Sequence, residues 1–239
     1  MGDSFPVRLM PGKTGIRMAI TFYYGAGSPF AWRVWLALEH KLLDYDQRVL
    51  SFSEGDLKKP EFAALAPRRK VPVLVDTQGP GQGQAPFVLY ESSAILEYLE
   101  EAYPQSGMPL FPGDLRGRAL IRRMVCEADN YVAPAVNRLL SRVLFTPQAQ
   151  WDEDKIASAH RDCAEELDAW GPQLRGEFLA GPLSAADLTL YPMVALAMRC
   201  GKKKPALELE NAMPRKLRDW MRRVERLPYL TKTWPPHWK

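Results

Sequence analysis

The first half of the chain alternates short apolar runs with segments whose apolar residues repeat at helical spacing. The apolar runs are rich in β-branched and aromatic residues, which favour strands, and they cover Met18–Tyr24, Tyr45–Leu50, Val71–Asp76 and Phe87–Tyr90. Helices are expected after the first run, over 29–41, and after the last, over 91–103. This order predicts a βαβ unit followed by a ββα unit, with one parallel and one antiparallel strand pair.

The second half of the chain shows helical patterns and no strand pattern of any strength. Helices are expected over 114–145, 152–174, 184–200 and 214–226, and Pro134 should kink or split the first of them. Ser184 and Asp187 have the spacing of a capping box, which marks the start of the third helix. That helix is apolar nearly all round, so we expect it to be buried at the centre of an all-helical domain.

These patterns divide the chain into four parts. Residues 1–17 are a leader without the apolar middle of a signal peptide, and 18–104 form an α/β domain. The Pro- and Gly-rich residues 105–113 are a linker, and 114–239 form the all-helical domain. No apolar run approaches the roughly 20 residues of a membrane span, so no membrane is expected as a partner.

Charge gives little reason to expect a nucleic-acid partner. The chain carries 32 basic and 28 acidic residues, a net charge of +4. The basic residues cluster late, in GKKKP and PRKLRDWMRRVER, but acidic residues interleave the second run. A solvated helix face is the simpler interpretation of that pattern.

The three cysteines are widely spaced and odd in number. Cys126, Cys163 and Cys200 form no C-x-x-C pair. Neither a disulfide framework nor a metal site is therefore expected, and the cysteines favour a cytoplasmic protein with buried thiols.

Ser28 stands at the most informative position in the chain. It follows the first strand and the turn Gly25-Ala26-Gly27, and Ser28-Pro29 opens a helix. Its hydroxyl therefore lies at the positive end of a helix, where an anion is stabilised and the pKa of a thiol is lowered. The competing interpretation is that Ser28 only caps the helix, and the stretch by itself leaves both open.

Four stretches in this order resemble the cytosolic glutathione transferase family. They are YYGAGSPFAWRVWLALEHK, APRRKVPVLVD, YESSAILEYLEEAYP and LSAADLTLYP, and the resemblance covers nearly the whole chain from about Met18 onward. The resemblance implies a thioredoxin-like N-terminal domain and a helical bundle, assembled as a homodimer. It also implies glutathione as the co-substrate.

The resemblance implies a catalytic role for Ser28. It matches the Ser of the tau, theta and zeta classes, and its string S-P-F-A follows the omega C-P-F-A with Ser for Cys. Phe30 of that string is an expected glutathione contact. Tyr24 is the alternative, because other classes use a Tyr near the end of the first strand; we expect Tyr23 and Tyr24 to be structural and to lie on opposite faces of that strand.

The other expected glutathione contacts come from two further motifs. Glu91 and Ser92 fall where a strand ends and a helix begins, which suits the γ-glutamyl carboxylate and ammonium. Val71 is expected to pair with the middle of glutathione beside a cis Val71–Pro72 bond, and Lys70 to reach the glycine carboxylate, which Arg68 and Arg69 could also do. Arg69 stands where the family usually has Gly, so a local turn different from that of the family is compatible with the sequence.

Two functions of different kinds are compatible with these residues. The first is a glutathione transferase that activates the thiolate for attack on a small hydrophobic electrophile. The alternative is a non-catalytic scaffold of the same fold that binds a protein or a polyanion, for which the basic final helix is the argument. Ser28, Lys70, Glu91 and Ser92 favour the enzyme, because a scaffold has no need of all four together.

Overall fold

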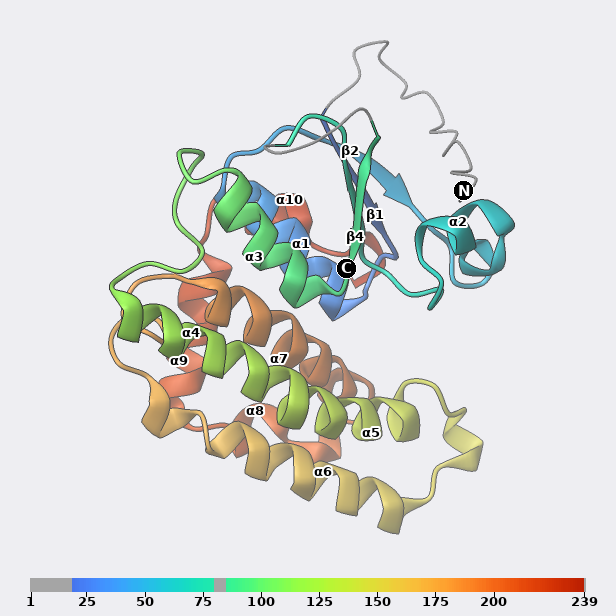
Figure 1. The fold of residues 1–239 in the computed structure, drawn as a ribbon. Helices are drawn as coiled ribbons and strands as arrows, with labels where there is room; N and C mark the ends of the chain where they lie inside the picture. The colour runs from blue at the N-terminus through green and yellow to red at the C-terminus, as the bar shows by residue number, and fades with distance from the viewer. Residues whose placement is uncertain (1–18, 80–84, 239) are drawn as a thin grey trace. The chain divides into compact units, whose positions relative to one another are not determined.

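The computed structural model describes residues 19–79 and 85–238. The leader 1–17 and the centre of the Gly/Gln-rich turn, residues 80–84, lie outside this range. The chain forms two compact units, one of residues up to Met108 together with Pro235–Lys239, and one of Pro109–Trp234 (Figure 1). Within the described residues, no helix is both long and apolar enough to span a membrane.

The first unit is built on a four-stranded mixed sheet. Its strands are β1 Ile20–Tyr24, β2 Tyr45–Val49, β3 Val73–Asp76 and β4 Phe87–Tyr90, and their spatial order is β2-β1-β3-β4. β1 and β2 are parallel, whereas β1 pairs with β3, and β3 with β4, in antiparallel register. The predicted βαβ and ββα units are therefore confirmed, and together they make the expected thioredoxin-like fold.

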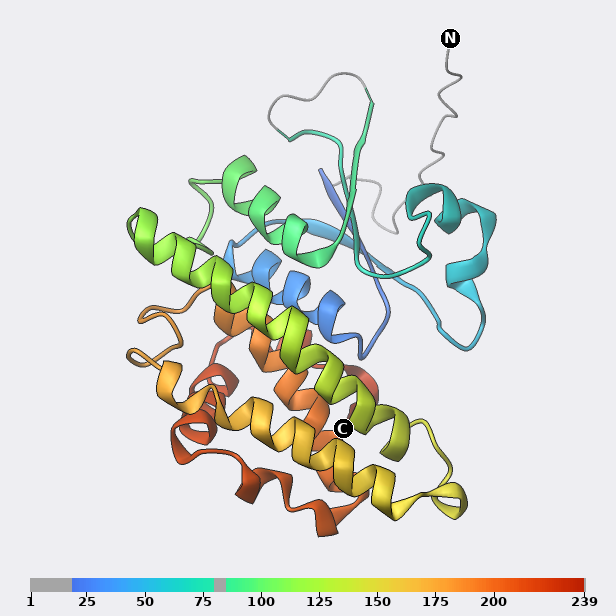
Figure 2. The ribbon, with the colours of Figure 1, turned by 60° about the horizontal axis from the view of Figure 1, so that its bottom comes forward.

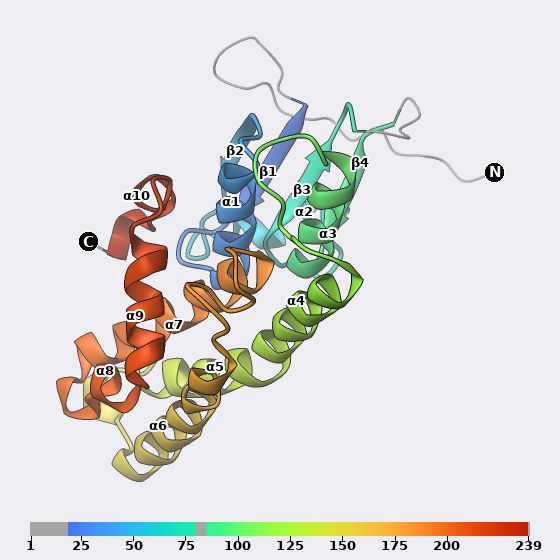
Figure 3. The same cartoon turned by 90° about the vertical axis from the view of Figure 1, so that its left-hand side faces the viewer.

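Helices cover both faces of this sheet. They are α1 Pro29–His40, α2 Pro60–Leu65 and α3 Ser92–Ala102, with a 3-10 turn, η1, at Asp56–Lys58. α1 and α3 lie side by side along the sheet (Figure 3). On the other face, Phe62 and Leu65 of α2 pack against Val73 and Val75 of β3. Successive side chains of β1 point to opposite faces of the sheet, so buried and half-buried residues alternate along the strand.

Asp76, at the end of β3, ties the sheet to α3. Its carboxylate is fully buried and accepts hydrogen bonds from the amides of Gln78 and Gly79, both at 2.8 Å. It also accepts from the hydroxyls of Tyr98, at 2.9 Å, and Tyr103. Four donors satisfy the buried carboxylate and set α3, whose N-terminus lines the candidate site, against the strand edge.

The second unit is helical, as predicted. Its helices are α4 Leu115–Glu127, α5 Ala133–Val143, α6 Glu153–Asp168, α7 Ala185–Lys203, α8 Leu209–Ala212, α9 Arg215–Glu225 and α10 Leu230–Thr233. Short turns η3, η4 and η5 lie at Gln148–Gln150, Gly171–Gln173 and Pro205–Leu207. A π-helical turn, η2 Ala128–Val132, joins α4 to α5 in one continuous path (Figure 2). Pro134 lies in the first turn of α5, so the irregularity falls just before the proline.

α7 forms the core of this unit, which confirms the expectation for the apolar helix. The buried residues run round its whole circumference from Ala185 to Ala197, and Pro192 lies inside the helix. Ser184 and Asp187 form the predicted capping box at its start. After α10, Pro236–Trp238 forms a 3-10 turn, η6.

Candidate functional site

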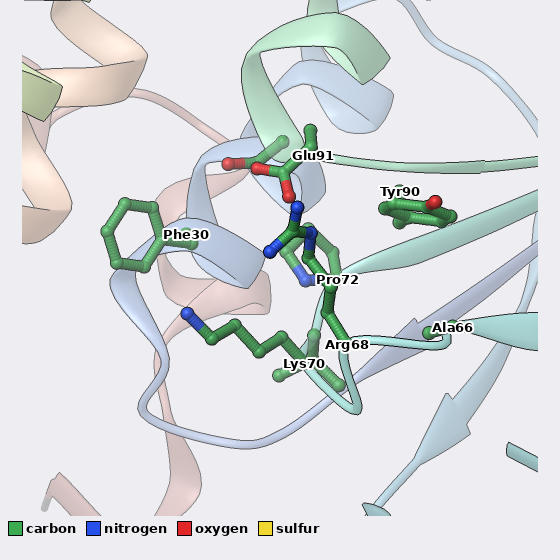
Figure 4. Close-up of a pocket in the computed structure, with 9 residues that line it drawn as sticks. Phe30, Ala66, Arg68, Lys70, Pro72, Tyr90 and Glu91 are labelled. Carbon is green, nitrogen blue, oxygen red and sulfur yellow. The ribbon is translucent and has the colours of Figure 1, made fainter. Parts of the chain in front are cut away.

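A cavity of about 130 Å³ lies in the first unit, where the loop before β3, the end of β4 and the starts of α1 and α3 meet. Nine residues line it: Phe30, Ala66, Arg68, Lys70, Val71, Pro72, Tyr90, Glu91 and Ser92. Figure 4 shows the Lys70 side chain extending toward Phe30, and the guanidinium of Arg68 pointing toward the carboxylate of Glu91. The structure thus brings together five of the six site residues expected from the sequence.

The wall formed by Glu91 and Ser92 is suited to an anion and a cation at once. Ser92 is buried at the first position of α3, and the amides of this first turn have no acceptor within the helix. Glu91 precedes it with φ 71° and an exposed side chain. A non-glycine residue at positive φ costs about 1–3 kcal/mol, and such residues gather at binding sites. Helix amides and a carboxylate therefore meet at one corner of the cavity.

The opposite wall is the loop that leads into β3. The Val71–Pro72 peptide bond is cis, as predicted, and both residues line the cavity. Arg69 has φ 53°, so the turn keeps the left-handed conformation that glycine favours although an arginine occupies it. Arg68 and Lys70, on either side of Arg69, are exposed cations that line the cavity and provide contacts for a carboxylate.

Ser28 is the N-cap of α1 and does not itself line the cavity, whereas Phe30, two residues on, does. The Ser28 amide donates to the carbonyl of Gly25 at 3.1 Å, which closes the turn. Its Oγ accepts from the amide of Ala31 at 3.3 Å, and this bond leaves the hydroxyl hydrogen free to donate. The side chain is half-buried. Ser28 is therefore a helix cap whose hydroxyl can still donate one hydrogen bond. This geometry is compatible with both interpretations from the sequence, a cap alone and a group that stabilises a thiolate.

Arg33 adds a buried positive charge beside Phe30 that was not predicted from the sequence. Its side chain is fully buried, and its guanidinium carbon lies 5.1 Å from the centre of the Phe30 ring. This distance is within the range of a cation–π contact. The signal in the sequence was weak, because an arginine three residues after Phe30 on a helix is usually solvated.

The Tyr24 side chain packs inside the first unit. Its ring stacks on Phe22 at 5.2 Å and packs against Trp35 of α1 at 4.9 Å. Its hydroxyl donates to Oε1 of Gln47 at 3.2 Å, and burial raises its pKa. Tyr23 packs instead against Phe62 of α2, so the two tyrosines lie on opposite faces of the sheet, as expected. Neither tyrosine lines the cavity.

Two lining residues, Ala66 and Tyr90, were not singled out from the sequence. Ala66 follows α2 and Tyr90 ends β4, so each enters the cavity because its element ends there. The position of Tyr90 directly before Glu91 was the one feature of the sequence that could have predicted its place in the cavity wall. Across the described residues, no three His, Cys, Asp or Glu side chains gather closely enough to hold a metal ion.

Comparison with known proteins assigns the family. The model of the glutathione S-transferase N-terminal domain matches residues 27–102. A glutathione S-transferase from the Antarctic clam Laternula elliptica is 32% identical, with 92% of this chain and 93% of that chain covered and a TM-score of 0.76. This chain belongs to the glutathione S-transferase family. The resemblance drawn from the four sequence stretches is thereby confirmed.

An isomerase and a second transferase are also similar to this chain. A maleylacetoacetate isomerase from Aspergillus fumigatus is 31% identical over 190 residues, with 77% of this chain and 79% of that protein covered. A glutathione transferase from Pseudomonas putida, with glutathione disulfide bound, shares the fold at a TM-score of 0.80 and 22% identity, covering 93% of each chain. The family thus includes an isomerase beside transferases.

Proposed function

We propose that this protein binds glutathione in the cavity and that Ser28 stabilises its thiolate for attack on a small hydrophobic electrophile. The observation that carries the proposal is the arrangement of charges around the cavity. Helix amides and Glu91 face it from the start of α3, and Arg68 and Lys70 face it from the loop before β3. Glutathione has a carboxylate and an ammonium at one end and a second carboxylate at the other.

In this proposal each end of glutathione meets its complement. The γ-glutamyl carboxylate binds the first-turn amides of α3 and the Ser92 hydroxyl, while the ammonium faces Glu91. The glycine carboxylate binds Lys70, with Arg68 beside it. A cavity of about 130 Å³ is smaller than the roughly 300–1,000 Å³ of most ligand pockets, so part of the tripeptide lies along the open surface.

The chemical step requires a thiolate at neutral pH. A cysteine thiol has a pKa of about 8.5, so most of it is protonated at pH 7. The Ser28 hydroxyl donates to the sulfur, and the N-terminus of α1 adds positive potential. The thiolate lone pair then forms the bond to an electrophilic carbon, and the leaving group departs with its bonding pair. In an isomerisation, the thiolate adds and is expelled again, which leaves glutathione unchanged.

A glutathione titration by calorimetry tests the binding part. We compare the wild type with Lys70→Ala and Glu91→Gln, and use Lys58→Ala as the control, because Lys58 is an exposed cation of η1 outside the cavity. Losing a hydrogen bond to a charged group costs about 1.5–3 kcal/mol, so each cavity variant should bind about 10- to 100-fold more weakly. Unchanged affinity in both cavity variants, or no binding by the wild type, contradicts the proposal.

The charged final helix supports the scaffold alternative less than its sequence alone suggested. On α9, Arg215 and Arg222 both form ion pairs with Asp219, and Arg222 also pairs with Glu210. Arg223 donates to the carbonyl of Glu177 at 2.6 Å. These contacts use part of the positive charge within the unit and leave less of it for a polyanion.

We include a homodimer and a reducing cytoplasm in the proposal. None of Cys126, Cys163 and Cys200 is in a disulfide, and burial raises the pKa of the Cys163 and Cys200 thiols to about 12. Cys126 is exposed, so the expectation of buried thiols was wrong for this residue. An exposed thiol without a disulfide is compatible with a compartment that keeps thiols reduced. Light scattering tests the assembly, because a homodimer has twice the mass of one chain and a monomer contradicts this part.

A further inference from the structure

The last residues of the chain lie in the first unit, beside the turn that leads to Ser28. Pro235–Lys239 group with the thioredoxin-like unit, although the preceding residues belong to the helical one. The Trp238 amide donates to the carbonyl of Pro235 at 2.9 Å, which closes the η6 turn. Trp238 is only 7% exposed, and its ring meets that of Trp32 of α1 edge-on at 5.3 Å. The end of the chain is therefore docked on α1, the helix that Ser28 caps.

The side chains of His237 and Trp238 are joined to each other. The indole Nε1 of Trp238 donates to Nε2 of His237 at 3.0 Å. Because Nε2 accepts this bond, the imidazole must carry its proton on Nδ1. His237 is otherwise exposed, so the buried Trp238 holds its ring in place.

Both rings fill the space beside Gly27. A Cβ added to Gly27 would stand 2.9 Å from Cε1 and Nε2 of His237, closer than real Cβ contacts come, and 3.1 Å from Nε1 of Trp238, closer than most of them. Gly27 also has φ 86°, which favours glycine. On another side of the same turn, a Cβ on Gly25 would overlap the ring of Phe52. The turn is thus enclosed by side chains from two distant parts of the chain.

We propose that His237 and Trp238 are positioning residues for Ser28, so that the carboxyl end of the chain sets how well the hydroxyl reaches the glutathione sulfur. This inference rests on the proposed function of Ser28. Gly27 directly precedes Ser28, and the Ser28 amide closes the turn onto Gly25. A shift of Gly27 toward the space left by a missing ring therefore moves Ser28, because the two are joined by one rigid peptide unit. The residues that line the cavity belong to other segments, apart from Phe30 of α1.

The test compares glutathione-dependent kinetics of full-length variants with an activated aryl halide as the second substrate. Trp238→Ala and His237→Ala remove the contact, and Trp238→Phe keeps a ring against Trp32 but has no N–H for His237. Pro236→Ala is the control, because Pro236 lies in the same η6 turn and is exposed. Ser28→Ala is measured beside them.

We expect both alanine variants to raise the pH midpoint of kcat by about 0.5–1 unit. This shift corresponds to a threefold to tenfold loss of kcat below the midpoint. KM for glutathione should stay within about twofold, because its charged contacts are made elsewhere. Trp238→Phe should retain part of the activity, and Pro236→Ala should match the wild type. A purely structural tail would change the unfolding temperature without moving the pH midpoint.

Amide hydrogen exchange of the peptide over 20–30 gives a readout independent of glutathione. Faster exchange in Trp238→Ala and His237→Ala, but not in Pro236→Ala, supports the inference. The inference is overturned if both alanine variants exchange at the wild-type rate. It is also overturned if their pH midpoint is unchanged while that of Ser28→Ala rises, and either result leaves the proposed function intact. An unchanged midpoint in Ser28→Ala overturns the proposed role of Ser28, and the inference with it.

Discussion

The indole nitrogen of Trp220 donates a 2.8 Å hydrogen bond to Oδ1 of Asp187 in the fully buried interior of the helical unit. The same carboxylate accepts from the amides of Leu179 and Ser184, both at 2.9 Å, and from the Ser184 hydroxyl at 3.0 Å. Asp187 thus caps α7 and joins this helix to α9 through Trp220 and to the loop before α7 through Leu179. One acidic residue organises three segments of the unit.

We predict that Asp187→Ala strongly destabilises the protein. The substitution leaves two amides and an indole N–H buried without an acceptor, and each such group costs about 1–3 kcal/mol. The free energy of unfolding should therefore fall by at least about 3 kcal/mol. Urea titration of the wild type and the variant measures this loss, with Trp220→Phe as the milder comparison. A loss below about 1 kcal/mol would show that the cap is dispensable.

Asp187 should also make stability depend on pH. Burial raises its pKa to about 6 from 3.8, against the opposing effect of its hydrogen bonds. Between these values the folded state holds a proton that the unfolded state releases, so the free energy of unfolding falls as pH rises. A shift of about two units corresponds to about 3 kcal/mol.

The control for this pH effect is Asp187→Asn, which cannot titrate at this position. All other titrating groups are common to the two proteins, so their difference reports Asp187 alone. The unfolding free energy of the wild type minus that of Asp187→Asn should decrease from pH 4 to pH 7. Urea titrations at several pH values give this difference. A difference that is constant or increases with pH would contradict the raised pKa.

Arg69→Gly should stabilise the protein. Arg69 has φ 53°, and a left-handed conformation costs a side-chain-bearing residue about 1–2 kcal/mol, partly offset by the greater freedom of an unfolded glycine. The expected net gain is about 0.5–1 kcal/mol in unfolding free energy. Lys58→Gly is the control, because Lys58 lies in the η1 turn and should lose stability. Equal effects of the two substitutions would argue against strain at Arg69.

The ion pair between Lys41 and Glu100 joins the ends of α1 and α3. Their charged atoms lie 3.0 Å apart, and the two side chains are 1% and 12% exposed. We predict that Lys41→Met alone costs about 3 kcal/mol, because it removes a buried positive charge from beside a carboxylate in a poorly solvated place. The double variant Lys41→Met, Glu100→Leu should recover much of this loss. A double-mutant cycle by urea unfolding measures the coupling, and strictly additive losses would contradict it.

The sequence predicted those features that local chemistry dictates. Alternation marked the strands, Ser28-Pro29 marked the start of α1, and the spacing of Ser184 and Asp187 marked the start of α7. The candidate glutathione contacts Lys70, Val71, Glu91 and Ser92 were found because each belongs to a short motif. Residues near the ends of strands and helices were thus the most predictable.

Long-range contacts were less predictable, because nothing in the local pattern records them. The docking of Trp238 on Trp32 joins residues about two hundred positions apart. The ring of Phe52 against Gly25 and the burial of Arg33 likewise depend on which elements meet in three dimensions. The side chains that enclose the Ser28 turn therefore became visible only in the folded chain.

The most direct test of the account is the pH titration of the thiolate absorbance of bound glutathione in the wild type, Ser28→Ala and Tyr24→Phe. We predict a pKa about one to two units below the free thiol value of about 8.5 in the wild type and in Tyr24→Phe. In Ser28→Ala the pKa should return most of the way to the free value while glutathione still binds. A lowered pKa that persists in Ser28→Ala would contradict the role of Ser28 and leave it as a helix cap.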